Sequence, residues 1–243
     1  MDFASRYHLG ARWRLRICLE LLHFGKNDRV LDAGCGDGFI SWRVCPYVDR
    51  VVGIDISDET IRMNQRFAND RLSFMTQDLN ELHGIFHQTF DKIICLDVLE
   101  HAFGFENIIK NFGSALKTSG ELLVTIPIKD HGHFQYSDNP LSVSDVLLKY
   151  GFRIELLETI SQPFLTRMGN RGIEILQKLL GLSRQKVDSY EKTLAFALRN
   201  KETSAFWLYK LLFGVLFALT ALDRKDYVPG DTYLLIKAHK ELD

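Results

Sequence analysis

The chain has 243 residues, a formal net charge of −1, 46% hydrophobic residues and 25% charged residues. This length suits one α/β domain with elaborations, and the near-neutral charge gives no electrostatic case for a nucleic-acid partner. The four cysteines form no C-x-x-C pair, which favours a reducing, cytoplasmic location.

Short apolar runs alternate with amphipathic segments along the chain, which predicts alternating strands and helices. The N-terminal helical segment, 1–27, is expected to carry a helix with a basic face at 11–24. The expected strands are 30–32, 50–55, 72–76, 90–96, 121–126, 152–160 and 232–239; the further expected helices are 38–47, one that begins after an N-cap at Ser57, 104–117 and 141–150. This order predicts βαβ units in a mostly parallel sheet, which binds ligands at the carboxyl ends of its strands.

The most informative motif is the nine-residue segment Val30–Gly38, VLDAGCGDG. An apolar run ends in an acid, Asp32, and glycines follow at every second position: Gly34, Gly36 and Gly38. Glycine allows a tight turn and a close approach of the backbone to a ligand. A strand that ends in such a loop and opens a helix therefore predicts a nucleotide-type pocket.

Two further positions bear on the kind of cofactor. The dinucleotide fingerprint requires a glycine where this sequence has Phe39, so that fingerprint fails. The next acid at a strand end, Asp55, lies 21 residues after Gly34, and this spacing suits a carboxylate that binds ribose hydroxyls.

Asp32 and the three glycines resemble the first motif of the class I S-adenosylmethionine-dependent methyltransferases. The resemblance covers about 28–160 and 231–240. It implies a doubly wound, Rossmann-like α/β sheet of seven strands, mostly parallel, with an antiparallel last strand. It also implies one methyltransferase domain over 1–243, with a helical insertion at 161–230.

By this resemblance, S-adenosylmethionine is the expected cofactor. Asp32 is expected to hold its ammonium group, Asp55 its ribose diol and Asp78 its adenine amino group. The other expected contacts are Gly34, Cys35, Gly36, Gly38, Ile56, Leu79 and Leu96. Two structural alternatives stay open, because Asp78 also suits a helix N-cap and Leu96 also suits the core.

The segment Leu96–His101, LDVLEH, follows the fourth expected strand and resembles the corresponding stretch of the ubiquinone-biosynthesis O-methyltransferases. His101 is the candidate general base, since an unperturbed histidine titrates near neutral pH; a structural histidine is the alternative. Asp97, Glu100 and His101 share one helical face and suit a divalent metal, but no second ligand cluster supports one, so no metal is expected. His133, after the fifth strand, is a second catalytic candidate or part of a surface loop.

The insertion 161–230 bears most directly on the acceptor. It has eleven Lys or Arg residues against six acids, and its apolar run at 205–222 holds one charge, Lys210. A spanning helix needs about 20 apolar residues. The run is therefore interpreted as a helix buried in a cap, a homodimer contact, or a peripheral membrane contact through 203–225. The membrane interpretation favours a lipid-linked acceptor and a location at the inner face of the membrane.

Three classes of function stay open. The first is O-methylation of a small-molecule, glycan or lipid-linked acceptor. The second is a non-catalytic module that binds S-adenosylmethionine. The third, methylation of protein or RNA, lacks an Asn-Pro-Pro-Tyr-type motif after the fourth strand, where the sequence has Leu96–Leu99, and nucleic acid is disfavoured by charge.

Overall fold

The computed structural model describes residues 9–128, 142–162, 228–229 and 233–241. The chain divides into two compact units, 1–13 with 162–228 and 14–161 with 229–243. The second unit carries every site residue discussed below. The first unit lies mostly outside the described residues, as does the expected insertion except for its ends. The organisation as a single domain therefore stays a prediction.

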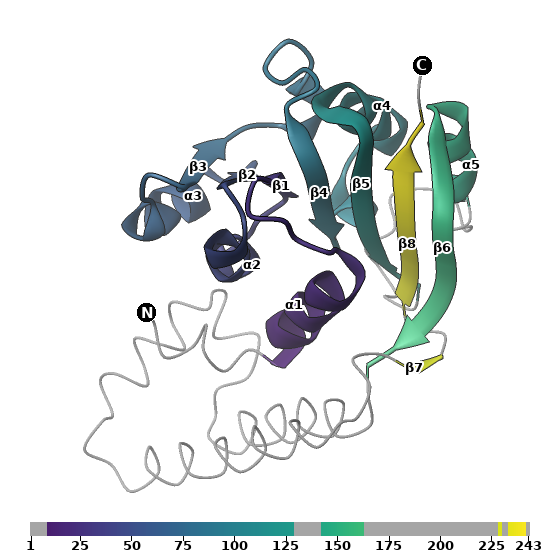
Figure 1. Ribbon diagram of the computed structural model, residues 1–243, viewed down its shortest axis with the longest axis horizontal. Helices are drawn as coiled ribbons and strands as arrows, with labels where there is room; N and C mark the ends of the chain where they lie inside the picture. Colours follow the sequence, from purple (N-terminus) through teal and green to yellow (C-terminus); the bar gives the residue numbers. More distant parts are fainter. Residues whose placement is uncertain (1–8, 129–141, 163–227, 230–232, 242–243) are drawn as a thin grey trace, which may run out of the picture. The chain divides into compact units, whose positions relative to one another are not determined.

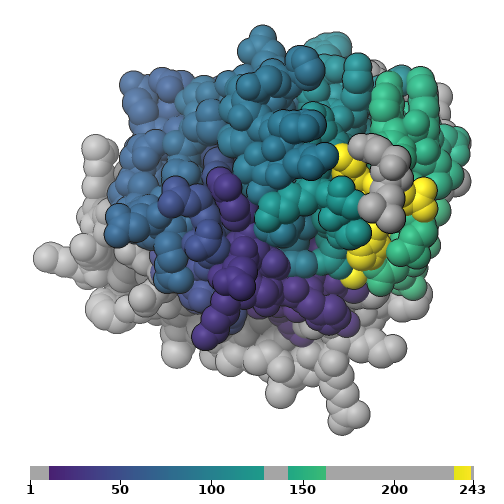
Figure 2. Space-filling view, turned by 45° about the horizontal axis from the view of Figure 1, so that its top comes forward, coloured from purple at the N-terminus to yellow at the C-terminus, as the bar shows by residue number. Residues whose placement is uncertain are grey.

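The frame of the second unit is a sheet with the strand order β3-β2-β1-β4-β5-β8-β6-β7 (Figure 1). Its strands are β1 (Arg29–Ala33), β2 (Arg50–Asp55), β3 (Leu72–Thr76), β4 (Phe90–Leu96), β5 (Leu116–Pro127), β6 (Phe152–Ser161), β7 (Val228–Pro229) and β8 (Tyr233–Lys240). Strands β1 to β5 are parallel, and β8 runs antiparallel to both β5 and β6. Figure 2 shows the same order on one face, where yellow β8 residues lie between teal and green ones. The expected Rossmann-like sheet with a late antiparallel strand is confirmed; the two-residue β7 was not expected.

Helices connect the parallel strands. They are α2 (Phe39–Val44), α3 (Asp58–Asn64), α4 (Phe105–Ala115) and α5 (Ser142–Lys149), and α1 (Leu9–Leu21) precedes β1. The 3-10 turns are η1 (Cys45–Tyr47), η2 (Gln65–Phe67), η3 (Leu79–Glu81) and η4 (Leu99–His101). Parallel crossovers are right-handed, so the reversal of strand order at β1 and β4 puts α2 and α3 on one face and α4 and α5 on the other. A crevice forms at such a reversal, outside the carboxyl ends of the strands.

The central strands are apolar on both faces, because helices cover both sides of a parallel sheet. Val30 and Leu31 on β1 and Ile93 and Ile94 on β4 have no exposed surface. Phe112 on α4 belongs to the same core cluster as Leu31 and Ile93. Full burial of each such side chain stabilises the fold by about 1.5–3 kcal/mol, and this core holds the ends of β1 and β4 in place around the crevice.

The junction between α4 and β5 differs from expectation. The helix expected at 104–117 ends at Ala115, and β5 begins at Leu116. A register irregularity follows, and Ser119 adopts φ +62°. Ser119 and Gly120 suggest a helix end, but the chain is already extended at Leu116, and Lys117 Nζ pairs with both carboxylate oxygens of Asp91 at 2.8 Å. This pairing with β4 is a tertiary contact that local sequence pattern does not predict.

Candidate functional site

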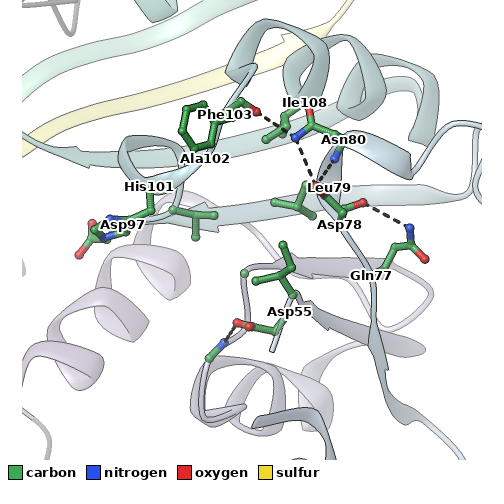
Figure 3. Close-up of a pocket in the computed structure, with 14 residues that line it drawn as sticks. Asp55, Gln77, Asp78, Leu79, Asn80, Asp97, His101, Ala102, Phe103 and Ile108 are labelled. Atoms are coloured by element: carbon green, nitrogen blue, oxygen red, sulfur yellow. Dashed lines mark hydrogen bonds between the residues drawn. The ribbon is translucent and has the colours of Figure 1, made fainter. Parts of the chain in front are cut away.

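A cavity of about 480 Å³ opens at the carboxyl ends of the parallel strands (Figure 3). Its walls come from the segments that follow β1, β2, β3 and β4, and from α4. This is the crevice that the strand order predicts. Of the expected contacts, the structure brings Gly34, Gly36, Asp55 and Ile56 to the wall; Asp78, Leu79 and the candidate base His101 also line it.

The glycine loop requires glycine for two different reasons. Gly34 has φ +76°, and a Cβ at this position would lie 2.3 Å from Val98 Cγ2, so no side chain fits. Gly36 has φ +50°, and a Cβ there would meet no protein atom within 4 Å, because Gly36 faces the cavity. The Gly36 N–H donates to Asp55 Oδ2 at 2.9 Å, and Asn64 Nδ2 donates to the Gly36 carbonyl at 2.7 Å. The loop is therefore held from β2 and α3, and a ligand meets bare backbone.

Asp55 lies at the carboxyl end of β2, in the floor of the cavity (Figure 3). Its Oδ2 accepts from Gly36 and its Oδ1 accepts from the Ser57 N–H at 2.9 Å. These two bonds fix the carboxylate, while an ionised carboxylate offers about four acceptor positions. Capacity remains for the two hydroxyls of a ribose. Ser57 caps α3 as expected, since its Oγ accepts from Thr60 N–H at 3.2 Å.

The turn that follows β3 forms the other end of the cavity. Asp78 Oδ1 accepts from the Asn80 N–H at 2.8 Å and caps η3, so the N-cap alternative for Asp78 is confirmed. Asp78 nevertheless lines the cavity, beside Leu79. Asn111 on α4, almost fully buried, donates to the Leu79 carbonyl at 2.9 Å and fixes the turn from behind. A capped turn held in this way presents a carboxylate and an apolar side chain in a rigid arrangement.

The structure does not bring Asp32 to the cavity wall. Asp32 is buried behind the glycine loop, and its Oδ2 accepts from Ser41 Oγ at 2.5 Å. The Ser41 backbone N–H also bonds to this carboxyl. Ser41 lies in the first turn of α2, whose N-cap, Gly38, has no side chain to offer, so Asp32 serves as the cap from β1. Burial raises the pKa of Asp32 to about 6, although the bonds from Ser41 oppose this shift.

Three further expected contacts, Cys35, Gly38 and Leu96, also lie outside the cavity lining. Cys35 and Gly34 both donate backbone N–H bonds of 2.8 Å to the Ile54 carbonyl, which ties the loop to the end of β2. Gly38 begins α2 with φ +72°. Cys35 and Gly38 therefore shape the glycine loop without lining the cavity, and Leu96 is the last residue of β4.

Asp97 is a cavity residue to which the sequence assigned only a metal-binding alternative. It follows β4 directly, adopts φ +55°, and lines the cavity at the end away from Asp78 (Figure 3). Thr125 Oγ1 donates to its Oδ1 at 2.6 Å, and Arg14 on α1 donates to its Oδ2 through Nε at 2.7 Å and also through Nη2. Its place directly after a parallel strand was the available signal; its partners, 28 and 83 residues away, gave none.

His101 ends η4 and lines the cavity with a side chain that is 53% exposed. Its Nε2 lies 3.7 Å from Glu100 Oε1. The geometry agrees with a group at the rim that has access to solvent. The second candidate, His133, lies outside the described residues.

The structure offers a different metal-type cluster from the one considered in the sequence. In the described ranges, Glu121, Glu155 and His239 are the three side chains that converge closely enough. Asp97, Glu100 and His101 do not form such a group. Lys237 Nζ lies 2.9 Å from Glu121 and 3.0 Å from Glu155, so an ammonium group already occupies this position between the carboxylates.

Comparisons with known proteins agree with the site. A family model described as "Methyltransferase domain" matches residues 24–146, half of the chain. The ubiquinone biosynthesis O-methyltransferase of Coxiella burnetii is 32% identical over 100 residues, 40% of this chain and 42% of that protein. The mitochondrial enzyme of the same name from Bos taurus is 30% identical over 103 residues, 40% of this chain and 28% of that protein. The matches thus span less than half of these relatives.

Solved structures show the same fold at low sequence identity. The phosphoethanolamine N-methyltransferase 2 of Haemonchus contortus, in complex with S-adenosyl-L-methionine, has a TM-score of 0.58 and 18% identity, covering 95% of this chain and 53% of that one. The YcgJ protein of Bacillus subtilis has a TM-score of 0.59 and 14% identity, covering 96% and 100%. The [4+2]-cyclase SpnF has a TM-score of 0.59 and 17% identity, covering 96% and 81%. With its glycine loop, strand order and matched domain, the chain belongs to the class I S-adenosylmethionine-dependent methyltransferase family.

Proposed function

We propose that this chain is an S-adenosylmethionine-dependent methyltransferase that binds its methyl donor in the cavity between β1, β2 and β4. The observation that carries the proposal is the charge of the walls. Among the described residues, three carboxylates, Asp55, Asp78 and Asp97, line the cavity and no Lys or Arg does. Arg14 pairs with Asp97, so Asp55 and Asp78 supply the negative charge of the walls that no paired cation offsets. This favours a cation and repels the pyrophosphate of a dinucleotide. S-adenosylmethionine supplies a methyl group on a positively charged sulfur.

The three carboxylates occupy separate places in the cavity, and each suits a different part of the donor (Figure 3). Asp78 and Leu79 suit the adenine, because a carboxylate accepts from an exocyclic amine and an apolar wall suits a flat ring. Asp55 suits the ribose diol. We assign the ammonium group of the methionine part to Asp97 instead of Asp32, since Asp97 lines the cavity and Asp32 does not.

The proposed reaction is O-methylation of a small-molecule, glycan or lipid-linked acceptor. Two observations support it. Two relatives that are 32% and 30% identical to this chain over 100 and 103 residues are named ubiquinone biosynthesis O-methyltransferases. His101 lies at the cavity rim, where a general base would take the proton of an acceptor hydroxyl. The chain's own task is then to orient the acceptor and to exclude water.

A non-catalytic module that binds S-adenosylmethionine is the second candidate, and the neighbour named [4+2]-cyclase SpnF shows that this fold is not confined to proteins named methyltransferases. A fold does not establish its chemistry. Methylation of protein or RNA has no supporting observation in the described residues.

The proposed membrane contact concerns 203–225, outside the described residues. Within the part of the chain that is described, no helix has the length and apolar run that crossing a bilayer requires. We propose a cytoplasmic protein that associates with the inner face of the membrane through this segment. The test is co-sedimentation with anionic vesicles at low salt, where recovery in the supernatant would contradict the contact.

Methyl transfer is tested with donor labelled in its methyl group. The protein is incubated with lipid, glycan and phenolic acceptor fractions, and label is expected in one of them. His101→Ala is expected to lower turnover while the affinity for S-adenosylhomocysteine stays unchanged, and His87→Ala, at an exposed histidine outside the cavity, is the matched control. Tight donor binding without transfer to any acceptor class would favour the non-catalytic module.

A further inference from the structure

Three arginines lie side by side at the amino edge of the sheet, the edge opposite the cavity. Arg29, Arg50 and Arg71 each follow an aspartate and recur every 21 residues. Arg29 and Arg50 begin β1 and β2 and are register partners. Arg71 directly precedes β3, and its carbonyl accepts from the Val51 N–H on β2 at 2.8 Å. These three residues, the arginine row, thus stand at the start of three neighbouring strands (Figure 1).

The register places the side chains of the row together. Register partners on parallel strands point to the same face of a sheet, and side chains two positions apart along a strand share that face. Leu31 and Val52, two positions after Arg29 and Arg50, belong to the core cluster that includes residues of α4. Arg29 and Arg50 therefore project from the α4 face at its amino edge, and all three arginines are exposed. Neighbouring strands lie about 4.8 Å apart, so the row spans about 10 Å.

The arginine row has no internal partner. Its three guanidinium groups form no ion pair and no hydrogen bond in the part of the chain that the structure describes. By contrast, Arg14 pairs with Asp97 and Arg62 pairs with Asp58. Like charges opposite each other on neighbouring strands destabilise a sheet. A local rule that is broken without internal compensation points to a functional surface.

The acids at the starts of β1 and β4 do not neutralise the row. Asp28, just before β1, has its carboxylate 3.6 Å from Lys92 Nζ. Both carboxylate oxygens of Asp91, near the start of β4, bind Lys117 Nζ at 2.8 Å. These two acids are thus paired with lysines, and the arginine row keeps its positive charge for an anion from outside.

We propose that the arginine row binds a compact, soluble compound that carries several phosphate charges. A guanidinium group is a planar fork of donors that matches two phosphate oxygens, and three such groups suit a ligand with three or more negative charges. Asp49 and Asp70 precede Arg50 and Arg71 and are also exposed. These acids repel an extended anionic surface such as a membrane, whereas a small ligand contacts only the guanidinium groups.

The arginine row is distant from the donor cavity. Five residue steps along β1 separate Arg29 from Gly34 in the cavity wall, and a rise of about 3.3 Å per residue gives a separation of about 16 Å. The cavity presents carboxylates, whereas the row presents guanidinium groups. The phosphate site therefore goes beyond the proposed function and does not depend on it.

The test is calorimetric titration of the purified chain with sodium tripolyphosphate at constant ionic strength, where saturable binding is expected. Arg50→Gln, at the centre of the row, is expected to lower the affinity by about tenfold or more, because hydrogen bonds to a charged group are lost. Arg50→Lys keeps the charge without the fork and is expected to restore part of the affinity. Arg153→Gln is the matched control, because Arg153 is an exposed arginine on β6 outside the row.

Urea denaturation checks that the variants fold and gives an independent readout. Because Arg50→Gln removes a like charge, its free energy of unfolding without ligand is expected to equal or exceed that of the wild type. Tripolyphosphate is expected to raise the urea midpoint of the wild type and of Arg153→Gln more than that of Arg50→Gln, since a ligand stabilises the folded state that binds it.

Three results would overturn the proposal. The first is an absence of saturable tripolyphosphate binding by the wild type, or equal binding by Arg50→Gln. The second is an equal loss of affinity in Arg153→Gln, which would indicate a general attraction of the anion to positive charge. The third comes from vesicles of phosphatidic acid in phosphatidylcholine: sedimentation that depends on Arg50, without tripolyphosphate binding, would assign the arginine row to a lipid surface.

Discussion

Gly34→Ala perturbs the contact between the glycine loop and the segment after β4. Two costs add at this position. The backbone has φ +76°, and an L-residue in the left-handed region costs about 1–2 kcal/mol. The new Cβ would lie 2.3 Å from Val98 Cγ2 and 2.9 Å from Val98 Cγ1, an overpacking that costs about 1–3 kcal/mol. The free energy of unfolding is therefore expected to fall by about 2–5 kcal/mol.

The two costs can be separated in a Val98→Ala background. Removing the Val98 methyl groups removes the two shortest contacts and leaves Val98 Cβ at 3.2 Å together with the backbone cost. Gly34→Ala is therefore expected to lower the free energy of unfolding by little more than about 1–2 kcal/mol there. Urea denaturation of the four proteins, followed by circular dichroism, measures both differences. An equal loss in the two backgrounds would refute the packing of Val98 on Gly34, and no loss in either would refute the backbone geometry of the loop.

Three other substitutions test the proposed donor contacts and the buried acid behind the loop. Asp55→Ala is expected to lower the affinity for S-adenosylhomocysteine by about tenfold or more in calorimetry, because it removes hydrogen bonds to a charged group. Asp58→Ala, at the start of α3 outside the cavity lining, is its control. An unchanged affinity of the Asp55→Ala protein would contradict the ribose contact. Asp97→Asn is expected to weaken the binding of S-adenosylhomocysteine but not that of 5′-methylthioadenosine, which keeps the base and ribose but lacks the amino-acid part. Equal losses of affinity for the two ligands would indicate a purely structural role for Asp97. Burial raises the pKa of the Asp32 carboxyl to about 6 from 3.8, so the folded protein binds the carboxyl proton more tightly than the unfolded chain does. This difference contributes about 3 kcal/mol to the free energy of unfolding below pH 4, and the contribution is lost as the pH rises through 6. Asp32→Asn is expected to lack this component in urea titrations over that pH range, and identical pH profiles would contradict the buried position of Asp32.

The sheet could be predicted because its determinants are local. Apolar runs such as Val30–Leu31 and Ile93–Leu96 mark strands without reference to the rest of the chain, and glycines mark the loop after the first one. The position of Asp55 at a strand end likewise placed it in the crevice, because the carboxyl ends of parallel strands meet there.

The parts that could not be predicted depend on contacts between distant residues. Asp32 precedes the glycines in the sequence and suggests a ligand contact, but its side chain faces Ser41 of α2 behind the loop. Asp97 reaches the cavity in a left-handed conformation fixed by Thr125 and Arg14, and no local pattern reports either partner.

The central claim is that the cavity binds an adenosyl donor with a positively charged sulfur. Equilibrium binding of S-adenosylmethionine, S-adenosylhomocysteine and NAD to the purified protein tests it most directly. We expect saturable binding of one molecule of either adenosyl ligand per chain and none of NAD. Absence of binding of both adenosyl ligands, or equally tight binding of NAD, would contradict it.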